Sequence, residues 1–218
     1  MNYSEALYFT FRDEKWIKKI LIGGVFTFIS FYCGLFFILG FFVMGYYLHV
    51  IKNVMRNEKT PLPDWSDLGK IFVDGVVGTI IFFIYFILIG LLFTLPIVRI
   101  ASDPFIMGVE KGITITFISL ITLIAWFLVI NTALIQFSIN NNFSSAFNLL
   151  EILNFIKDNF GNLLAIAIFS AILNGILFLA GLGILAPFTN FWGLVIQAHL
   201  LGQCGLEHFK STPMVKAA

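Results

Sequence analysis

Charged side chains are scarce in this chain. Asp, Glu, Lys and Arg make up 11% of its 218 residues, whereas soluble domains usually contain about 25%. Hydrophobic residues reach 59%. This balance excludes a water-soluble globular domain, and it excludes an intrinsically disordered chain for the same reason. We therefore expect a protein that folds in a lipid bilayer.

The features that most enzymes and nucleic-acid-binding proteins need are also missing. Cysteine occurs only at Cys33 and Cys204, which form no metal or redox motif. The net charge of +1 gives no field that would attract nucleic acid. The sequence contains no hydrolase, metalloprotease or nucleotide-binding motif. We expect no enzymatic activity, no cofactor, no metal and no nucleic-acid partner.

Long apolar runs predict an all-α fold, a polytopic bundle of about six transmembrane helices. A bilayer core of about 30 Å needs roughly 20 apolar residues per helix. In a single membrane domain over 1–218, we expect spans at about 17–33, 35–51, 71–98, 113–137, 162–182 and 185–205. The first two would form a short hairpin that turns near Cys33 and Gly34, where glycine makes a tight turn easy. The sequence leaves open whether this hairpin crosses the bilayer fully or re-enters it.

The distribution of basic residues predicts the orientation. With six spans, both termini lie on one side, and of 13 Lys and Arg residues only Arg99 and Lys111 lie on the other. Five spans would divide the basic residues almost evenly. Because basic residues concentrate in cytoplasmic loops, we expect cytoplasmic N- and C-termini.

Polar residues alternate with apolar ones in three connecting segments, which predicts amphipathic interfacial helices at about 3–16, 64–70 and 144–158. Asp64 or Ser66 would cap the helix that enters the third span. A short outer helix is expected after Asp103. We expect Trp16 and Trp65 to anchor the chain at the membrane interface. Basic residues of the inner face are expected to contact lipid headgroups: Arg12, Lys15, Lys18, Lys19, Lys52 and Arg56.

Several short motifs lie before and between the first spans. They are Arg12-Asp13 with Trp16, Lys18-Lys19 before Gly23-Gly24, Gly45-Tyr46, Leu62-Pro63-Asp64-Trp65, and Val73-Asp74-Gly75. In these motifs the chain resembles the domain of unknown function 4013 family, which groups uncharacterised archaeal and bacterial membrane proteins. The resemblance implies a multi-pass protein of a prokaryotic cell membrane. It supplies no known activity, so it assigns no catalytic residue.

A few polar residues lie deep in the expected spans and are candidates for an intramembrane site: Asp74, Asn131, Gln136, Asn174, Gln197 and His199. Each also has a structural interpretation. Asp74 lies near the interface, where an ion pair with a neighbour is the simpler role. His199 lies one turn from Gln203, which suits a hydrogen bond between helices.

Two kinds of function follow from these residues. The first is a structural, lipid-binding or partner-binding membrane component, with membrane lipids, another membrane protein or a second copy as partner. A stripe of small residues at Ala167, Ala171 and Gly175 would allow close helix association. The alternative is a transporter or channel for ions or small solutes, which requires the deep polar residues to converge on one cavity. An enzyme acting on lipid would need a site near Asp74 or His199.

Overall fold

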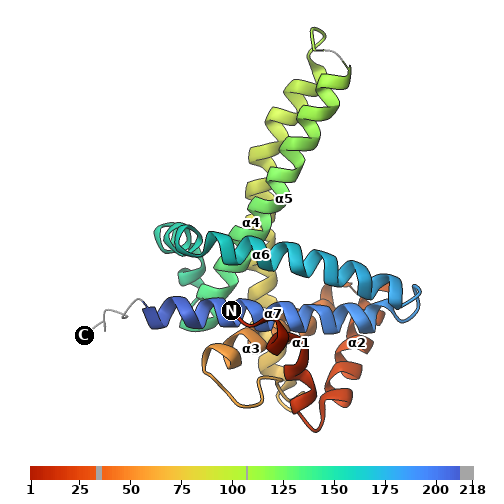
Figure 1. Cartoon of the computed structure of the whole chain (residues 1–218), viewed down its shortest axis with the longest axis vertical. Helices are drawn as coiled ribbons and strands as arrows, with labels where there is room; N and C mark the ends of the chain where they lie inside the picture. The colour runs from red at the N-terminus through yellow and green to blue at the C-terminus, as the bar shows by residue number, and fades with distance from the viewer. Residues whose placement is uncertain (33–35, 107, 212–218) are drawn as a thin grey trace.

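The computed structural model describes residues 1–32, 36–106 and 108–211, and these residues contain helices and no strand (Figure 1). The all-α prediction is confirmed. The elements follow one another as α1 (Tyr3–Tyr8), η1 (Phe9–Arg12), α2 (Trp16–Tyr32), α3 (Phe36–Met55), α4 (Leu68–Ser102), α5 (Gly108–Asn140), η2 (Phe143–Phe147), α6 (Leu149–Ala180) and α7 (Ala186–Ser211).

Helices α3 and α7 form the centre of the body. Helix α3 packs against α2, α4, α5 and α7. Helix α7 is buried on nearly every face from Phe191 to Gly205, as expected for a helix with neighbours all round. These two helices carry many of the buried side chains around which the other helices are arranged.

Glycines bring α3 and α4 into backbone contact. A Cβ added to Gly45 would overlap the carbonyl of Ile71, and one added to Gly75 would overlap the carbonyl of Phe41. Small residues at such crossings let membrane helices approach closely. The glycines of the Gly45-Tyr46 and Asp74-Gly75 motifs are therefore explained by packing.

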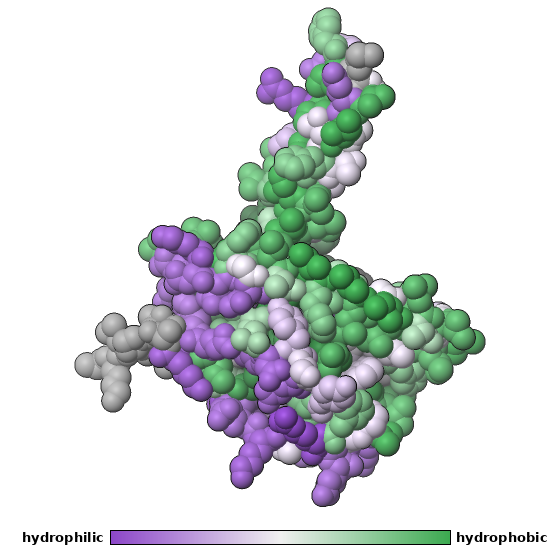
Figure 2. All heavy atoms as spheres, viewed as in Figure 1, coloured by the Kyte–Doolittle hydropathy of each residue, from purple (hydrophilic) through white to green (hydrophobic). Residues whose placement is uncertain are grey.

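Helices α4 and α5 form a long hairpin that projects from the body, while α6 and α7 run side by side across its base (Figure 1). The 35 residues of α4 correspond to about 52 Å. Figure 2 shows apolar residues along the hairpin, with hydrophilic residues at its tip and on one side of the body. Four helices among the described residues are long and apolar enough to cross a membrane: Ile38–Met55 within α3, and the whole of α4, α5 and α6.

The N-terminal segment and the segment before α4 differ in detail from the expected surface helices. In the range 3–16, helix α1 and the 3-10 turn η1 end at Arg12 and bury Ala6 and Phe9 in the core. In the range 64–70, the helix begins only at Leu68. Its N-cap is Asp67, whose carboxylate accepts a hydrogen bond from the Lys70 backbone N–H at 3.2 Å, and neither Asp64 nor Ser66 takes that role.

The segment 144–158 is divided between η2 and the first turns of α6, and a kink at Asn159 separates these turns from the expected fifth span. The backbone of α6 leaves helical geometry at Asn159 (φ −117°, ψ 16°). There the side-chain amide of Asn159 donates to the carbonyl of Phe155 at 3.0 Å, and such local bonds disturb a helix. After α4, Asp103 ends the helix and no outer helix forms over residues 103–106. The turn expected at Cys33 and Gly34 lies outside the described residues.

Candidate functional site

An apolar cavity of about 580 Å³ lies between α2, α3, α4, α5 and α7. On α3 its lining extends from Gly40 to Tyr47, and on α5 from Leu123 to Leu134. The eleven-residue separation on α5 corresponds to a length of about 16 Å. Most of the lining side chains are aromatic or aliphatic, and the volume is within the usual range of ligand pockets, about 300–1,000 Å³. The cavity could accommodate a hydrocarbon chain.

One end of the cavity carries a small polar cluster formed by three helices. The hydroxyl of Tyr47 on α3 donates to Oδ1 of Asn131 on α5 at 2.7 Å. It accepts a hydrogen bond from Nε2 of Gln197 on α7 at 3.0 Å. Tyr47 and Asn131 are both 7% exposed. The Tyr47–Asn131–Gln197 cluster therefore joins three helices and faces the cavity with uncharged groups.

The other polar side chains of the lining are engaged with their own helices. The hydroxyls of Thr27, Ser30 and Thr79 each donate to the carbonyl four residues earlier, at 2.7–2.9 Å. Near the far end, the Trp126 indole N–H donates to the Phe86 carbonyl at 3.1 Å, and the two rings stack. The polar character of the cavity is thus concentrated in the Tyr47–Asn131–Gln197 cluster.

Asp74, the one acidic candidate, lies outside this cavity. Its carboxylate is 2.7 Å from Nε2 of His49. Because His49 lies one turn after Gly45 on α3, this pair joins α3 to α4 beside the crossing at which the glycines bring the two helices together. The two side chains are 25% and 15% exposed. Asp74 is therefore paired, as its structural interpretation requires, but its partner is His49 and not Lys70, Arg56 or a helix N-terminus, which the sequence had suggested.

The remaining candidates are scattered. Gln136 is buried in α5, 3% exposed. Asn174 on α6 donates to the Ser170 carbonyl at 2.8 Å. His199, also 3% exposed, stacks on Phe9 with ring centroids 4.1 Å apart. Of the six candidates, therefore, the structure brings only Asn131 and Gln197 to the cavity, and no group of His, Cys, Asp and Glu in the described residues could hold a metal ion.

Lys19 belongs to a buried network. Its ammonium lies 2.7 Å from the Asp13 carboxylate, 3.0 Å from that of Asp64 and 2.8 Å from the Leu62 carbonyl. These three acceptors use all three of its donors. The Trp65 indole donates to the Lys19 carbonyl at 2.9 Å. The Leu62-Pro63-Asp64-Trp65 motif is thus fastened to the start of α2, which leaves Lys19 unable to contact lipid headgroups and places Trp65 within the protein.

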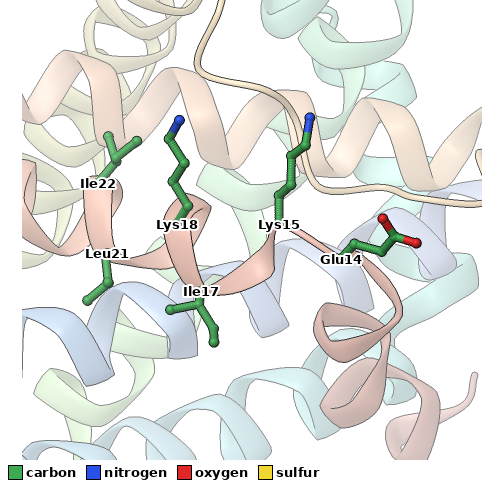
Figure 3. A pocket seen from close by; sticks show the side chains of 6 residues that line it. All are labelled: Glu14, Lys15, Ile17, Lys18, Leu21 and Ile22. Carbon is green, nitrogen blue, oxygen red and sulfur yellow. The ribbon is translucent and has the colours of Figure 1, made fainter.

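The neighbouring lysines are exposed. Lys15 and Lys18 point to one side of the start of α2, and Ile17 and Leu21 point to the other (Figure 3). Ile17 and Leu21 are 57% and 51% exposed. Apolar side chains beside long basic ones suit the boundary between hydrocarbon and headgroups.

The other basic and aromatic candidates differ in their partners. Arg12 is exposed and pairs with Glu5 at 3.1 Å, and Arg56 is exposed. Lys52 donates to the side chain of Asn141. Trp16 is half-buried and packs edge-on against Phe11. Lys15, Lys18 and Arg56 are therefore the exposed members of this basic set for which the described residues show no side-chain partner.

Tyr47, the centre of the polar cluster, was not among the site residues predicted from the sequence. Tyrosine is common in membrane helices as an interfacial residue, so its presence in α3 gave no specific signal. Its position in the middle of an apolar segment, between Phe42 and Val50, is the feature that could have indicated a buried hydrogen bond.

The fold and its apolar helices define a helical membrane protein. A family model described as "Protein of unknown function (DUF4013)" matches residues 28–186, and the chain belongs to that family. The family that the sequence motifs indicated is thereby confirmed.

One relative is described only as an uncharacterised protein, MJ1189, of Methanocaldococcus jannaschii. It is 31% identical over 134 residues, which cover 59% of this chain and 46% of the relative. The chain thus matches about half the length of that archaeal protein. No solved structure is significantly similar.

Proposed function

We propose that this protein is a lipid-binding component of a prokaryotic cell membrane that holds the hydrocarbon part of a lipid in the cavity between α2, α3, α4, α5 and α7. The observation that carries the proposal is the cavity itself, about 580 Å³ in volume, apolar along its length and polar at one end. Bilayer lipids are the most abundant apolar molecules available to a cavity among membrane helices. Burial of each CH₂ group there contributes about 0.8 kcal/mol.

The basic residues of the start of α2 add a second contact with lipid. We place Lys15 and Lys18 against anionic headgroups, where each contributes about 1 kcal/mol. This contact would orient the body at the membrane surface, and the cavity would select the bound molecule. Transport of solutes has weaker support, because Asp74, Gln136, Asn174 and His199 do not line the cavity with Asn131 and Gln197.

Filling the cavity tests the proposal. Gly40 lines it, and a Cβ built there meets nothing within 4 Å, so Gly40→Leu adds a side chain at the cavity wall where there is room for its first carbon. Gly161→Leu on α6 is the matched control, since Gly161 also has open space but lies outside the cavity. We expect Gly40→Leu to lower the binding of radiolabelled hexadecan-1-ol to detergent-purified protein at least tenfold. Equal binding by wild type, Gly40→Leu and Gly161→Leu would rule out the cavity as the site.

A further inference from the structure

We infer that the bound lipid carries an uncharged hydroxyl or carbonyl group, which the Tyr47–Asn131–Gln197 cluster recognises. This inference rests on the proposed function and specifies the class of ligand: a long-chain molecule with a neutral polar end, in contrast to a phospholipid or a free fatty acid. It follows from the hydrogen-bonding capacity that the cluster leaves unused, and from the absence of charge around the cavity.

The Tyr47–Asn131–Gln197 cluster contains hydrogen-bond donors and an acceptor that have no partner among the described residues. An amide side chain offers two N–H groups and one carbonyl oxygen. Asn131 uses one N–H on the Phe127 carbonyl at 2.8 Å and its carbonyl on Tyr47. Gln197 uses one N–H on Tyr47. Among the described residues, nothing engages the second N–H of either amide or the carbonyl oxygen of Gln197.

These unused groups lie where a ligand would end. Asn131 and Gln197 both line the cavity, and Asn131 is only 7% exposed. A polar group that faces an apolar cavity without a hydrogen-bond partner is costly. A ligand hydroxyl could accept from an amide N–H and donate to the Gln197 carbonyl, and a ligand carbonyl could accept from both amides. A hydroxyl that accepts from both amides as well would satisfy all three unused groups, whereas a carbonyl would satisfy the two N–H groups.

A charged end is disfavoured at the same place. No Lys, Arg, His, Asp or Glu side chain is in the lining among the residues that the structure describes. The His49–Asp74 pair satisfies its own charges at the α3–α4 crossing. Burying a phosphate or carboxylate without a counter-charge costs far more than two neutral hydrogen bonds return. The cavity therefore selects against ionised headgroups.

The test compares three probes with the same sixteen-carbon chain: hexadecan-1-ol, hexadecane and hexadecyl phosphate. Each displaces radiolabelled hexadecan-1-ol from purified protein, at equal mole fraction in the detergent. In the double variant Asn131→Leu/Gln197→Leu, we expect the ratio of alcohol to alkane affinity to fall about tenfold, because two hydrogen bonds are lost. This change of ratio is independent of how each probe partitions into micelles.

Controls separate recognition from folding. Asn174→Leu removes an amide outside the cavity, and we expect it to leave the ratio unchanged. Tyr47→Phe removes one hydroxyl, and a fall of about threefold is expected. Hexadecyl phosphate should displace the label at least tenfold less well than the alcohol does.

The outcomes distinguish the two levels of the proposal. One contradicting result is an equal ratio of alcohol to alkane affinity in wild type and the double variant, and another is a phosphate that competes as well as the alcohol. In either case the cavity binds hydrocarbon chains without recognising a neutral polar group, and only the inference fails. If wild-type protein binds none of the three probes, the proposed function fails with it.

Discussion

At the scale of single residues, the closest contact between helices depends on Gly75 and Gly45. We predict that Gly75→Ala lowers the free energy of unfolding by about 2–3 kcal/mol, because its methyl group would force α4 away from the Phe41 carbonyl. Gly69→Ala, also on α4 but in open space, should be neutral or stabilising by up to about 1 kcal/mol. Thermal unfolding in detergent measures both, and a similar effect of the two substitutions would contradict the packing described.

Lys19 gives a second prediction at this scale. Lys19→Met would leave the Asp13 carboxylate buried without its partner, and we expect a loss of about 3–5 kcal/mol in stability. Lys18→Met changes an exposed neighbour and should cost no more than about 0.5 kcal/mol. Denaturant unfolding followed by circular dichroism compares the two variants. Equal stability of Lys19→Met and Lys18→Met would show that the buried network contributes nothing.

The chemistry of individual residues could be predicted only in part. Polarity within an apolar segment identified Asn131 and Gln197, which the structure joins through Tyr47. The same signal selected Gln136 and Asn174, because polarity alone does not show which face of a helix a residue occupies. Lys19 was expected to contact headgroups, but it is buried and bonded in part to the Leu62 carbonyl, 43 positions further along the chain, which local sequence could not reveal.

At the scale of elements, α1 and η1 are attached to α7 by their side chains and by the N-terminus. Phe9 stacks on His199, and the Asn2 backbone N–H donates to Gln203 at 2.8 Å. We predict that Phe9→Ala, at a site 2% exposed, lowers stability by about 3–5 kcal/mol. Phe11→Ala, at a site 46% exposed, should cost about 1 kcal/mol. If limited proteolysis cleaves residues 1–12 equally fast in both variants, this segment is not held by Phe9.

The existence of the helices was predictable, because apolar runs of this length have few other structures in a membrane. The residues at which the helices begin and end were less predictable. Helix α1 and the turn η1 bury Ala6 and Phe9, and both elements contact α7. An amphipathic pattern does not distinguish this tertiary contact from a contact with a membrane surface. In α6 the polar stripe of 144–158 and the apolar run after it meet at a kink at Asn159, close to the boundary between the two helices that the sequence predicted.

At the scale of the whole molecule, hydrophilic residues lie at the tip of the α4–α5 hairpin and on one side of the body (Figure 2). We propose that these regions lie on opposite sides of the membrane, with both termini cytoplasmic. In a chain with Cys33→Ser and Cys204→Ala, Asp103→Cys at the tip should react with an impermeant maleimide in intact cells. Glu151→Cys at the start of α6 should react only after lysis. Labelling of both from the same side would overturn this orientation.

The central claim is that the cavity holds a lipid with a neutral polar end. Native mass spectrometry of wild-type protein and of Gly40→Leu, each released from its own membranes, tests this claim most directly. We expect wild type to carry a bound lipid whose fragments contain a long chain and an uncharged hydroxyl or carbonyl group. We expect Gly40→Leu to carry little or none of this lipid. A wild-type protein free of lipid, or the same adduct at the same abundance in Gly40→Leu, would contradict it.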